Sequence, residues 1–529
     1  MRARPQPDPP KTFRRRGSTF GVGLLAAVLA TLLWAVPGAS AAETIYWSNY
    51  PQNTLASANL DGSGGGRFNT GGKPSEGSEG LAIDSATGRL YWSSFSSGPG
   101  NTGGIFFAGL GGGDAGQLST GGATVNEPSG IAIDPVTRTL YWTNYDGGTG
   151  DKGTVSWARL DGSAAGDLNT SGATVDDPGP IALDIAGGRV FWANYSTDTI
   201  SFARLDNSGG GGNLDISGAT PPSTISGLSV NPATGQLYWI DNDGEHISRA
   251  NLTGGGGGDF DYSTAPFLDP YGMAFDPATG KIYWANYDNG NVPAEAFGFA
   301  NLSGGGGGIK IASAPVEGPQ LPVILKGPSG TGAPVITKAP KSAGLSCSQG
   351  SWAADYAGSF VYQAPHTYAY QWTLNGVPIV GATANAYTAT APGAYACTVT
   401  AANVSGSAAQ TSAPVQVNAA NFKLALKGGK ASAKAGGKAT FRVVATNTGD
   451  LAGASAKLCV KAPKKAGKEV KAPKCASLKK LAGGAKRTIK LRVRARKSAE
   501  GRYRLTFRVR GAKSTKAVKA TLVVKAPKG

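Results

Sequence analysis

The chain has 529 residues, 40% of them hydrophobic, which is enough to build several packed cores and excludes a wholly disordered protein. Glycine is abundant, with 80 residues, but no Gly-X-Y period is present, so the chain is not a collagen. The net charge of +18 is concentrated in residues 421–529, which hold 31 Lys and Arg against three acidic residues, whereas residues 42–420 are net acidic.

Residues 1–41 are predicted to be a signal peptide. A positive cluster ending at Arg16 precedes an apolar stretch from Phe20 to Val36, and Ala39-Ser40-Ala41 supplies the small-residue cleavage pattern. An uncleaved membrane anchor is the alternative, but this apolar stretch is shorter than the roughly 20 residues that span a bilayer. We expect a secreted, extracellular protein, in solution or at the cell surface, with no transmembrane segment after cleavage.

Residues 42–325 contain a repeat. An aromatic pair recurs at intervals of 45 to 50 residues, at Tyr46-Trp47, Tyr91-Trp92, Tyr141-Trp142, Phe191-Trp192, Tyr238-Trp239 and Tyr283-Trp284. Four short strands per repeat of about 45 residues make one propeller blade, so a six-bladed β-propeller is predicted. The strand at Ile45 lacks a preceding inner strand, and the run ending at Leu325 lacks a following aromatic strand. These two are expected to pair and close the ring, which removes two exposed sheet edges.

The repeated Tyr-Trp-x-Asn/Asp, followed in one repeat by Ala-Arg-Leu-Asp-Gly-Ser (158–163), resembles the YWTD propellers of the low-density lipoprotein receptor family. The resemblance implies a propeller that binds proteins and is not an enzyme. Its fourth motif position is occupied by Asn49, Ser94, Asn144, Asn194, Asp241 and Asn286. Only Asp241 keeps the family's acidic residue, so the ligand preference of the receptors does not carry over.

Residues 326–332 are rich in Gly, Pro and Ser and are predicted to be a linker. Residues 333–419 resemble a bacterial immunoglobulin-like domain, because Tyr370-Gln371-Trp372 lies between Cys347 and Cys397 and Tyr395 stands two residues before the second cysteine. The resemblance implies a β-sandwich in which a disulfide between the two cysteines packs on the buried tryptophan.

Residues 420–529 hold Cys459 and Cys475 and resemble the adhesion-related sandwich domains of bacterial surface proteins, notably at residues 446–450. In an exported chain, two disulfides, each within its own domain, are the simplest arrangement of the four cysteines. The predicted fold class is therefore all-β, a six-bladed β-propeller plus two C-terminal Ig-like β-sandwich domains.

Apolar and cationic residues alternate along two stretches of this basic β-sandwich domain. The arginines are Arg492, Arg494 and Arg496 in the first stretch and Arg502, Arg504, Arg508 and Arg510 in the second. Period-two alternation predicts strands with one buried and one cationic face, and a hairpin would place all the guanidinium groups on one surface. Such a surface suits an anionic envelope polymer, with a merely solubilising face as the alternative. Dedicated nucleic-acid binding is not expected, because Tyr503 and Phe507 fall on the apolar side.

No catalytic residue, metal ligand or cofactor is predicted, and the chain is expected not to be an enzyme. Only His246 and His366 are present, in different domains, so a histidine base or a multi-histidine metal site is not expected. The expected function is binding or adhesion, with propeller loop faces that hold an extracellular protein or glycan; a structural envelope protein is a further alternative.

The enzymatic alternative is a Ca²⁺-dependent, lactonase-like propeller hydrolase, which needs inward-facing carboxylates and Asn. One such residue recurs per repeat, at Asp84, Asp134, Asp184, Asn231 and Asp276. Their position at the start of a hairpin turn predicts a turn-capping role instead. Residues 241–245 form another acidic cluster that is too short for an EF-hand loop, and a loop Ca²⁺ site there is left open.

Overall fold

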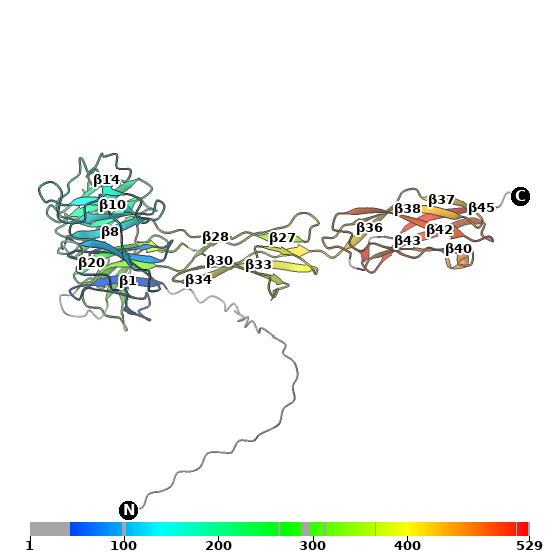
Figure 1. Ribbon diagram of the computed structural model, residues 1–529, viewed down its shortest axis with the longest axis horizontal. Helices are drawn as coiled ribbons and strands as arrows, with labels where there is room; N and C mark the ends of the chain where they lie inside the picture. Colours follow the sequence, from blue (N-terminus) through cyan, green and yellow to red (C-terminus); the bar gives the residue numbers. More distant parts are fainter. Residues whose placement is uncertain are drawn as a thin grey trace, which may run out of the picture. The chain divides into compact units, whose positions relative to one another are not determined.

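The computed structural model describes residues 43–97, 102–262, 265–287, 296–311, 314–364, 367–453, 455–514 and 516–526. The predicted signal peptide lies outside these residues. Apart from one 3-10 turn at Lys464–Ala466, the regular secondary structure of the described residues is β (Figure 1). The predicted fold class, an all-β chain with a propeller followed by β-sandwiches, is confirmed. In the described part of the chain no helix has the length and apolar character to cross a membrane.

The described residues of the N-terminal body form six sheets. Each sheet has four antiparallel strands, ordered from the inner strand at the axis to the outer strand at the rim. The inner strands are β4 (Leu81–Asp84), β8 (Pro128–Asp134), β12 (Pro178–Asp184), β16 (Ile225–Asn231), β20 (Pro270–Asp276) and β24 (Pro319–Leu325). The aromatic pairs lie on β1 (Thr44–Asn49), β5 (Arg89–Ser94), β9 (Thr139–Asn144), β13 (Arg189–Asn194), β17 (Gln236–Asp241) and β21 (Lys281–Asn286). The third strands are β2 (Thr54–Asn59), β6 (Gly104–Gly109), β10 (Thr154–Arg159), β14 (Thr199–Arg204), β18 (His246–Asn251) and β22 (Phe297–Asn301).

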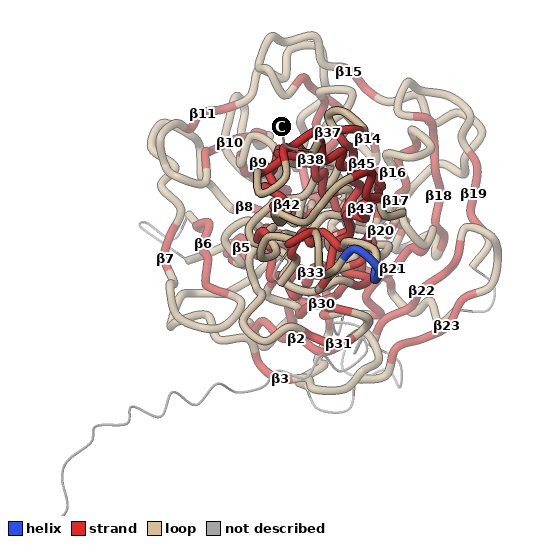
Figure 2. Tube along the Cα trace, turned by 90° about the vertical axis from the view of Figure 1, so that its right-hand side faces the viewer, coloured by secondary structure: helices blue, strands red, loops and turns tan. Residues whose placement is uncertain are grey.

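Short outer strands complete the sheets at the rim of the ring, as Figure 2 shows. They are β3 (Gly66–Arg67), β7 (Gly116–Gln117), β11 (Ala165–Asp167), β15 (Gly212–Asn213), β19 (Gly258–Phe260) and β23 (Gly306–Ile309). Inner strands of neighbouring sheets contact one another around the axis, including β24 with β4.

The ring closes through its two ends. β1 pairs antiparallel with β24, so that Ile45 lies opposite Ile324. The first sheet therefore combines the last inner strand with the first three strands of the chain, and the side-chain oxygen of Asn49 also accepts a hydrogen bond of 3.2 Å from the backbone N–H of Glu317. The closure expected from the two unmatched strands is present.

The cores lie between the sheets. The tryptophan of each aromatic pair is fully buried, and each cluster of buried side chains draws on two neighbouring sheets. For example, Tyr91 and Ala82 of one sheet pack with Trp142 and Ile131 of the next. Because both faces of a blade are covered, the strands are apolar without a clean alternation, and burial of each large side chain contributes on the order of 2–3 kcal/mol.

A segment that follows the propeller in sequence closes one end of its axis. β29 (Val361–Tyr362) pairs parallel with β24, and the carbonyl oxygens of Gly358, Ser359 and Phe360 accept hydrogen bonds of 2.9 to 3.2 Å from the backbone N–H groups of inner strands. Phe360 packs against core clusters of three different sheet pairs. We call residues 355–363 the axial segment.

The predicted linker is held in place at both ends. Lys326 pairs with Asp276 at 2.7 Å and with Glu43 at 2.9 Å, both in the propeller. Residues 330–332 form β25 (Gly330–Gly332), which pairs with β28 (Ser351–Trp352). The predicted linker therefore makes defined contacts at Lys326 and at residues 330–332.

Two β-sandwiches follow. One sheet of the first sandwich has the order β26 (Ile336–Thr337), β27 (Gly344–Cys347), β32 (Ala386–Thr388). The other has the order β31 (Val377–Pro378), β30 (Thr367–Leu374), β33 (Gly393–Asn403), β34 (Gly406–Thr411), and β35 (Val415–Val417) also pairs with β33. A disulfide joins Cys347 of one sheet to Cys397 of the other, next to the fully buried Trp372.

The second sandwich has two five-stranded sheets around one apolar core. One sheet has the order β40 (Val470–Lys471), β42 (Lys486–Ala495), β38 (Lys438–Asn447), β36 (Asn421–Leu426), β44 (Lys513–Ser514). The other has the order β37 (Lys430–Lys434), β45 (Val518–Lys525), β43 (Gly501–Arg510), β39 (Lys457–Lys461), β41 (Ala476–Ser477). A disulfide joins Cys459 to Cys475, so both expected disulfides are formed.

Candidate functional site

The fourth position of the repeated motif has a structural role. The side-chain oxygen of Asn144 accepts hydrogen bonds from Trp142 Nε1 at 3.1 Å and from the backbone N–H of Asn126 at 3.0 Å. Its amide nitrogen donates to the hydroxyls of Thr154 and Ser156. An amide that accepts on one side and donates on the other fits this position, which explains why Asn replaces the acidic residue of the receptor motif.

The next residue along the chain is aromatic in five of the six repeats: Tyr50, Phe95, Tyr145, Tyr195 and Tyr287. The backbone fixes their direction, because Tyr145 N–H donates to the carbonyl of Glu127 at 2.9 Å and Tyr195 N–H donates to that of Asp177 at 3.0 Å. Neighbouring rings lie 6.1 to 6.4 Å apart, centre to centre. These side chains form an aromatic face at the end of the axis opposite the axial segment.

At the centre of this face, equivalent positions of the inner strands meet around the axis. They are Glu79, Ser129, Gly179, Ser226, Tyr271 and Gln320. The hydroxyl of Ser129 donates a hydrogen bond of 2.8 Å to the Glu79 carboxylate, and the hydroxyls of Tyr195 and Tyr271 lie 3.4 Å apart. Gly179 leaves room for this convergence, since a Cβ there would lie 2.3 Å from the Tyr195 ring.

Glu79 lines one end of a narrow axial cavity of about 30 Å³, and Phe360 lines the other. Burial raises the pKa of Glu79, the hydrogen bond from Ser129 only partly offsets this, and the nearby Glu127 carboxylate adds to the rise. Burial also raises the pKa of Tyr195 and of Tyr271. The site therefore holds one poorly solvated carboxyl group and two phenols that stay protonated as hydrogen-bond donors.

The recurring Asp and Asn residues that start the hairpin turns lie at the opposite end of the inner strands. Asp134 accepts hydrogen bonds from the backbone N–H of Val136 at 2.8 Å and from the Thr137 hydroxyl at 2.6 Å. Asp84, Asp184, Asn231 and Asp276 cap their turns in the same way. Within the described ranges, no group of three or more His, Cys, Asp or Glu residues could hold a metal ion. The donor set does not fit the Ca²⁺ of the lactonase-like alternative.

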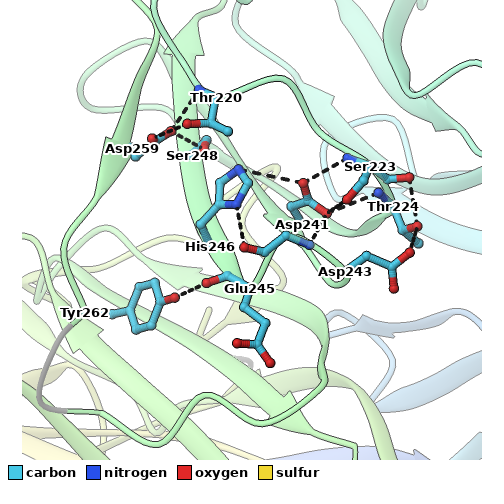
Figure 3. A network of polar contacts seen from close by, with 11 residues as sticks. Thr220, Ser223, Thr224, Asp241, Asp243, Glu245, His246, Ser248, Asp259 and Tyr262 are labelled. Carbon is cyan, nitrogen blue, oxygen red and sulfur yellow. Dashed lines mark hydrogen bonds and ion pairs between the residues drawn. The ribbon is translucent and has the colours of Figure 1, made fainter.

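The second acidic cluster, around Asp241, belongs to a network of polar contacts (Figure 3). The buried Asp241 carboxylate accepts hydrogen bonds from the N–H and hydroxyl of Ser223 at 2.8 and 2.9 Å, from Thr224 N–H at 3.1 Å and from Gly244 N–H at 3.0 Å. Burial raises the pKa of Asp241, but these hydrogen bonds outweigh it and the pKa lies below its usual value. His246 Nε2 lies 3.7 Å from the same carboxylate. The Asp241 carboxylate accepts all its hydrogen bonds from within the protein, so this residue holds its loop in place.

The arginines of the basic domain do not share one surface. β42, with Arg492 and Arg494, pairs with β38 and β40, whereas β43, with Arg502 to Arg510, pairs with β45 and β39. Arg496 directly follows β42, in the connection between the two strands. The two strands do not form the hairpin that a single cationic surface requires, because residues 496–500 carry the chain from one sheet to the other. Both arrangements bury the alternating apolar residues, so alternation alone cannot separate them.

Residues 89–221, about a quarter of the chain, match the family model described as Lactonase, 7-bladed beta-propeller. Among solved structures, the propeller is similar to one in the nidogen/laminin complex, with 17% identity, a TM-score of 0.41, and coverage of 53% of this chain and 98% of that one. A protein from Bacteroides uniformis provisionally assigned as a 6-phosphogluconolactonase has 15% identity, a TM-score of 0.35, and coverage of 58% and 89%. No curated protein matches the sequence.

The expectation that the chain is not an enzyme is corrected by the lactonase match, which points to a hydrolase and covers Ser129, Tyr145 and Tyr195. Glu79 and the aromatic face were not predicted as site residues. The signal for the aromatic face was present, since the residue after Tyr-Trp-x-Asn is aromatic in most repeats. His366 lies outside the described residues.

Proposed function

We propose that the propeller is a lactonase-like hydrolase whose substrate binds at the aromatic face and reacts beside Glu79. The observation that carries this proposal is the juxtaposition of a carboxyl group of raised pKa with two converging phenols at the propeller axis. The lactonase family match over residues 89–221 supports the reaction class.

The residues suit hydrolysis of a cyclic ester. The Glu79 carboxylate takes a proton from water, and the water oxygen attacks the lactone carbonyl carbon. The hydroxyls of Tyr195 and Tyr271 donate hydrogen bonds to the oxyanion that develops on the carbonyl oxygen. The ring C–O bond then breaks, and the leaving alkoxide takes the proton from Glu79, which gives a hydroxy acid.

The surroundings favour an uncharged sugar lactone over a phosphorylated one. Aromatic faces pack well on the apolar C–H faces of a sugar ring, and Tyr145 and Tyr195 present such faces next to Glu79. Acidic residues stand around them, since the carboxylates of Asp177, Asp146 and Glu127 all contribute to raising the pKa of Tyr145. A phosphate group would be repelled there.

The test is proton release during hydrolysis of glucono-δ-lactone, followed in a pH-stat and corrected for spontaneous hydrolysis. Glu79→Gln should lower the rate by about 10²–10⁴-fold, as expected for loss of a general base. Asp114→Asn is the matched control, because Asp114 is an exposed carboxylate on an outer loop. A wild-type rate no faster than the spontaneous one, for neutral and phosphorylated lactones alike, rejects the hydrolase.

The second candidate is a secreted or cell-surface binding protein, built on a six-bladed YWTD-type propeller, an Ig-like spacer and a basic sandwich. The aromatic face would hold an extracellular protein or glycan, and the basic domain would associate with an anionic envelope polymer. Two disulfides support an oxidising, extracellular location. If the propeller is a binding protein, Glu79→Gln should still capture a ligand from culture medium and Tyr145→Ala should capture less of it. Neither variant should hydrolyse the lactone.

A further inference from the structure

We propose that the C-terminal sandwich carries two independent anion-binding faces, on opposite sides, and bridges two segments of a phosphate-bearing linear polymer. This inference rests on the proposed association of the basic domain with anionic polymers. It adds that the domain is bivalent, whereas a domain with a single cationic surface would bind only one polymer segment.

The first face lies on the outside of the sheet that contains β42 and β38. Its exposed cations are Lys438, Arg442, Lys490, Arg492 and Arg494. The register places Lys438 opposite Arg494 and Arg442 opposite Lys490. Like charges directly opposite each other destabilise a sheet, so a bound anion would relieve repulsion here.

The second face lies on the outside of the sheet that contains β43, β45 and β39. Its exposed cations are Lys457, Lys461, Arg502, Arg504, Arg508, Arg510 and Lys519. Lys457 lies opposite Arg510 in the register. The second face therefore repeats the charge pattern of the first on a different set of strands.

The apolar core separates the two faces. Leu491 and Val493 of β42 and Leu505 and Phe507 of β43 point inward into one buried cluster. Across this core the rings of Phe441 and Phe507 lie 5.4 Å apart, centre to centre. The arginines that alternate with these residues must point outward on opposite sides, because successive side chains of a strand alternate between faces.

The domain's own acidic residues do not neutralise either face. Asp450 pairs with Lys338 of the preceding sandwich at 3.0 Å, and Glu469 accepts a hydrogen bond of 2.8 Å from the Tyr503 hydroxyl. Glu500, the third acidic residue of 421–529, lies between the two strands. Among the residues that the structure describes, no ion pair engages a cation of either face.

The spacing of the cations indicates a polymer and not a single ion. Alternate residues of a strand lie about 6.8 Å apart, so Lys490, Arg492 and Arg494 form a row that matches a chain with regularly repeated anionic groups. The guanidinium group binds phosphate through two parallel, charge-assisted hydrogen bonds, which favours a phosphate-bearing polymer over an uncharged one. Each face would take its own polymer segment.

The experiment measures light scattering of the full mature chain titrated with long-chain inorganic polyphosphate, next to direct binding on a polyphosphate resin. A bivalent protein gives a scattering maximum at an intermediate ratio that disappears in excess polymer, because each polymer chain then carries too few protein molecules to form a network. Two triple variants each neutralise one face: K490Q/R492Q/R494Q and R504Q/R508Q/R510Q. The control K152Q/R67Q/K310Q removes the same charge from exposed propeller residues.

We expect each single-face variant to stay on the resin at low salt but to lose most of the scattering maximum. The variant that combines the two triples should lose both resin binding and the scattering maximum. The control should behave as the wild type. Scattering by a single-face variant equal to that of the wild type, or loss of all binding in only one of the two triples, overturns the two-face proposal. A wild-type chain that does not bind polyphosphate at all rejects instead the association on which the proposal rests, and leaves the lactone assay unaffected.

Discussion

The hydroxyl of Ser129 donates a hydrogen bond of 2.8 Å to the carboxylate of Glu79 from the equivalent position of the neighbouring inner strand. The two residues are 50 positions apart in sequence and meet only because the sheets are arranged around one axis. A hydrogen bond donated to a carboxylate stabilises its charged form, so Ser129 holds the pKa of Glu79 below the value that burial alone would give.

Ser129→Ala should therefore move the pH dependence of lactone hydrolysis. Without the hydrogen bond the pKa of Glu79 rises further, so the activity that depends on its ionised form appears at higher pH. The pH-rate profile of kcat/KM measures this shift. Ser226→Ala is the control, because Ser226 occupies the equivalent position but donates to the carbonyl of Pro270. An unshifted profile in Ser129→Ala would argue against Glu79 as the titrating base.

Tyr195→Phe should lower kcat by about 10²-fold through loss of one oxyanion donor, with little change in KM. The matched control is Tyr50→Phe, since Tyr50 belongs to the same aromatic face but is 48% exposed. Steady-state kinetics on glucono-δ-lactone separate the two constants. A change confined to KM would reduce Tyr195 to a substrate-packing residue.

Glu79→Gln should stabilise the folded protein at neutral and alkaline pH. The pKa of Glu79 is raised in the folded state, so its contribution to stability falls as pH rises from the unfolded pKa through the folded one. Glutamine removes that loss. The difference in Tm between variant and wild type should be smallest in acid and grow with pH. A constant difference across pH would show that Glu79 is not poorly solvated.

The axial segment should contribute measurably to propeller stability. Gly358 has φ +85°, and a Cβ there would meet the Leu183 carbonyl oxygen and lie 3.5 Å from Val230. Gly376 has φ +83° with open space around it. Both Gly→Ala changes cost about 1 kcal/mol for the backbone, but only Gly358→Ala adds a steric clash. Denaturant unfolding followed by tryptophan fluorescence should show the larger loss for Gly358→Ala.

Removal of the second disulfide should destabilise the basic sandwich. Cys459 and Cys475 close a loop with a sequence separation of 16. The chain-entropy model assigns about 3 kcal/mol to such a loop, so C459S/C475S should lower the free energy of unfolding by about that amount. Calorimetry of the full chain measures it. An unchanged transition of this sandwich would mean that its strands hold the loop between Cys459 and Cys475 without the disulfide.

The sequence predicts well those features that depend on a repeated local pattern of residues. The aromatic pairs repeat at a fixed interval, and the unmatched strands at Ile45 and Leu325 leave one way to close a ring. The pairing of β42 and β43 was not predictable, because the same alternation of apolar and cationic residues serves a hairpin or two facing sheets. The Glu79 site was missed for a related reason, since its members come from different blades and only the ring brings them together.

The axial segment also decides what can reach Glu79. With residues 355–363 hydrogen-bonded across one end of the inner strands, a long polymer cannot thread through the propeller. A ligand therefore has to approach the carboxylate from the aromatic face, and in the proposed hydrolase the product has to leave by the same opening.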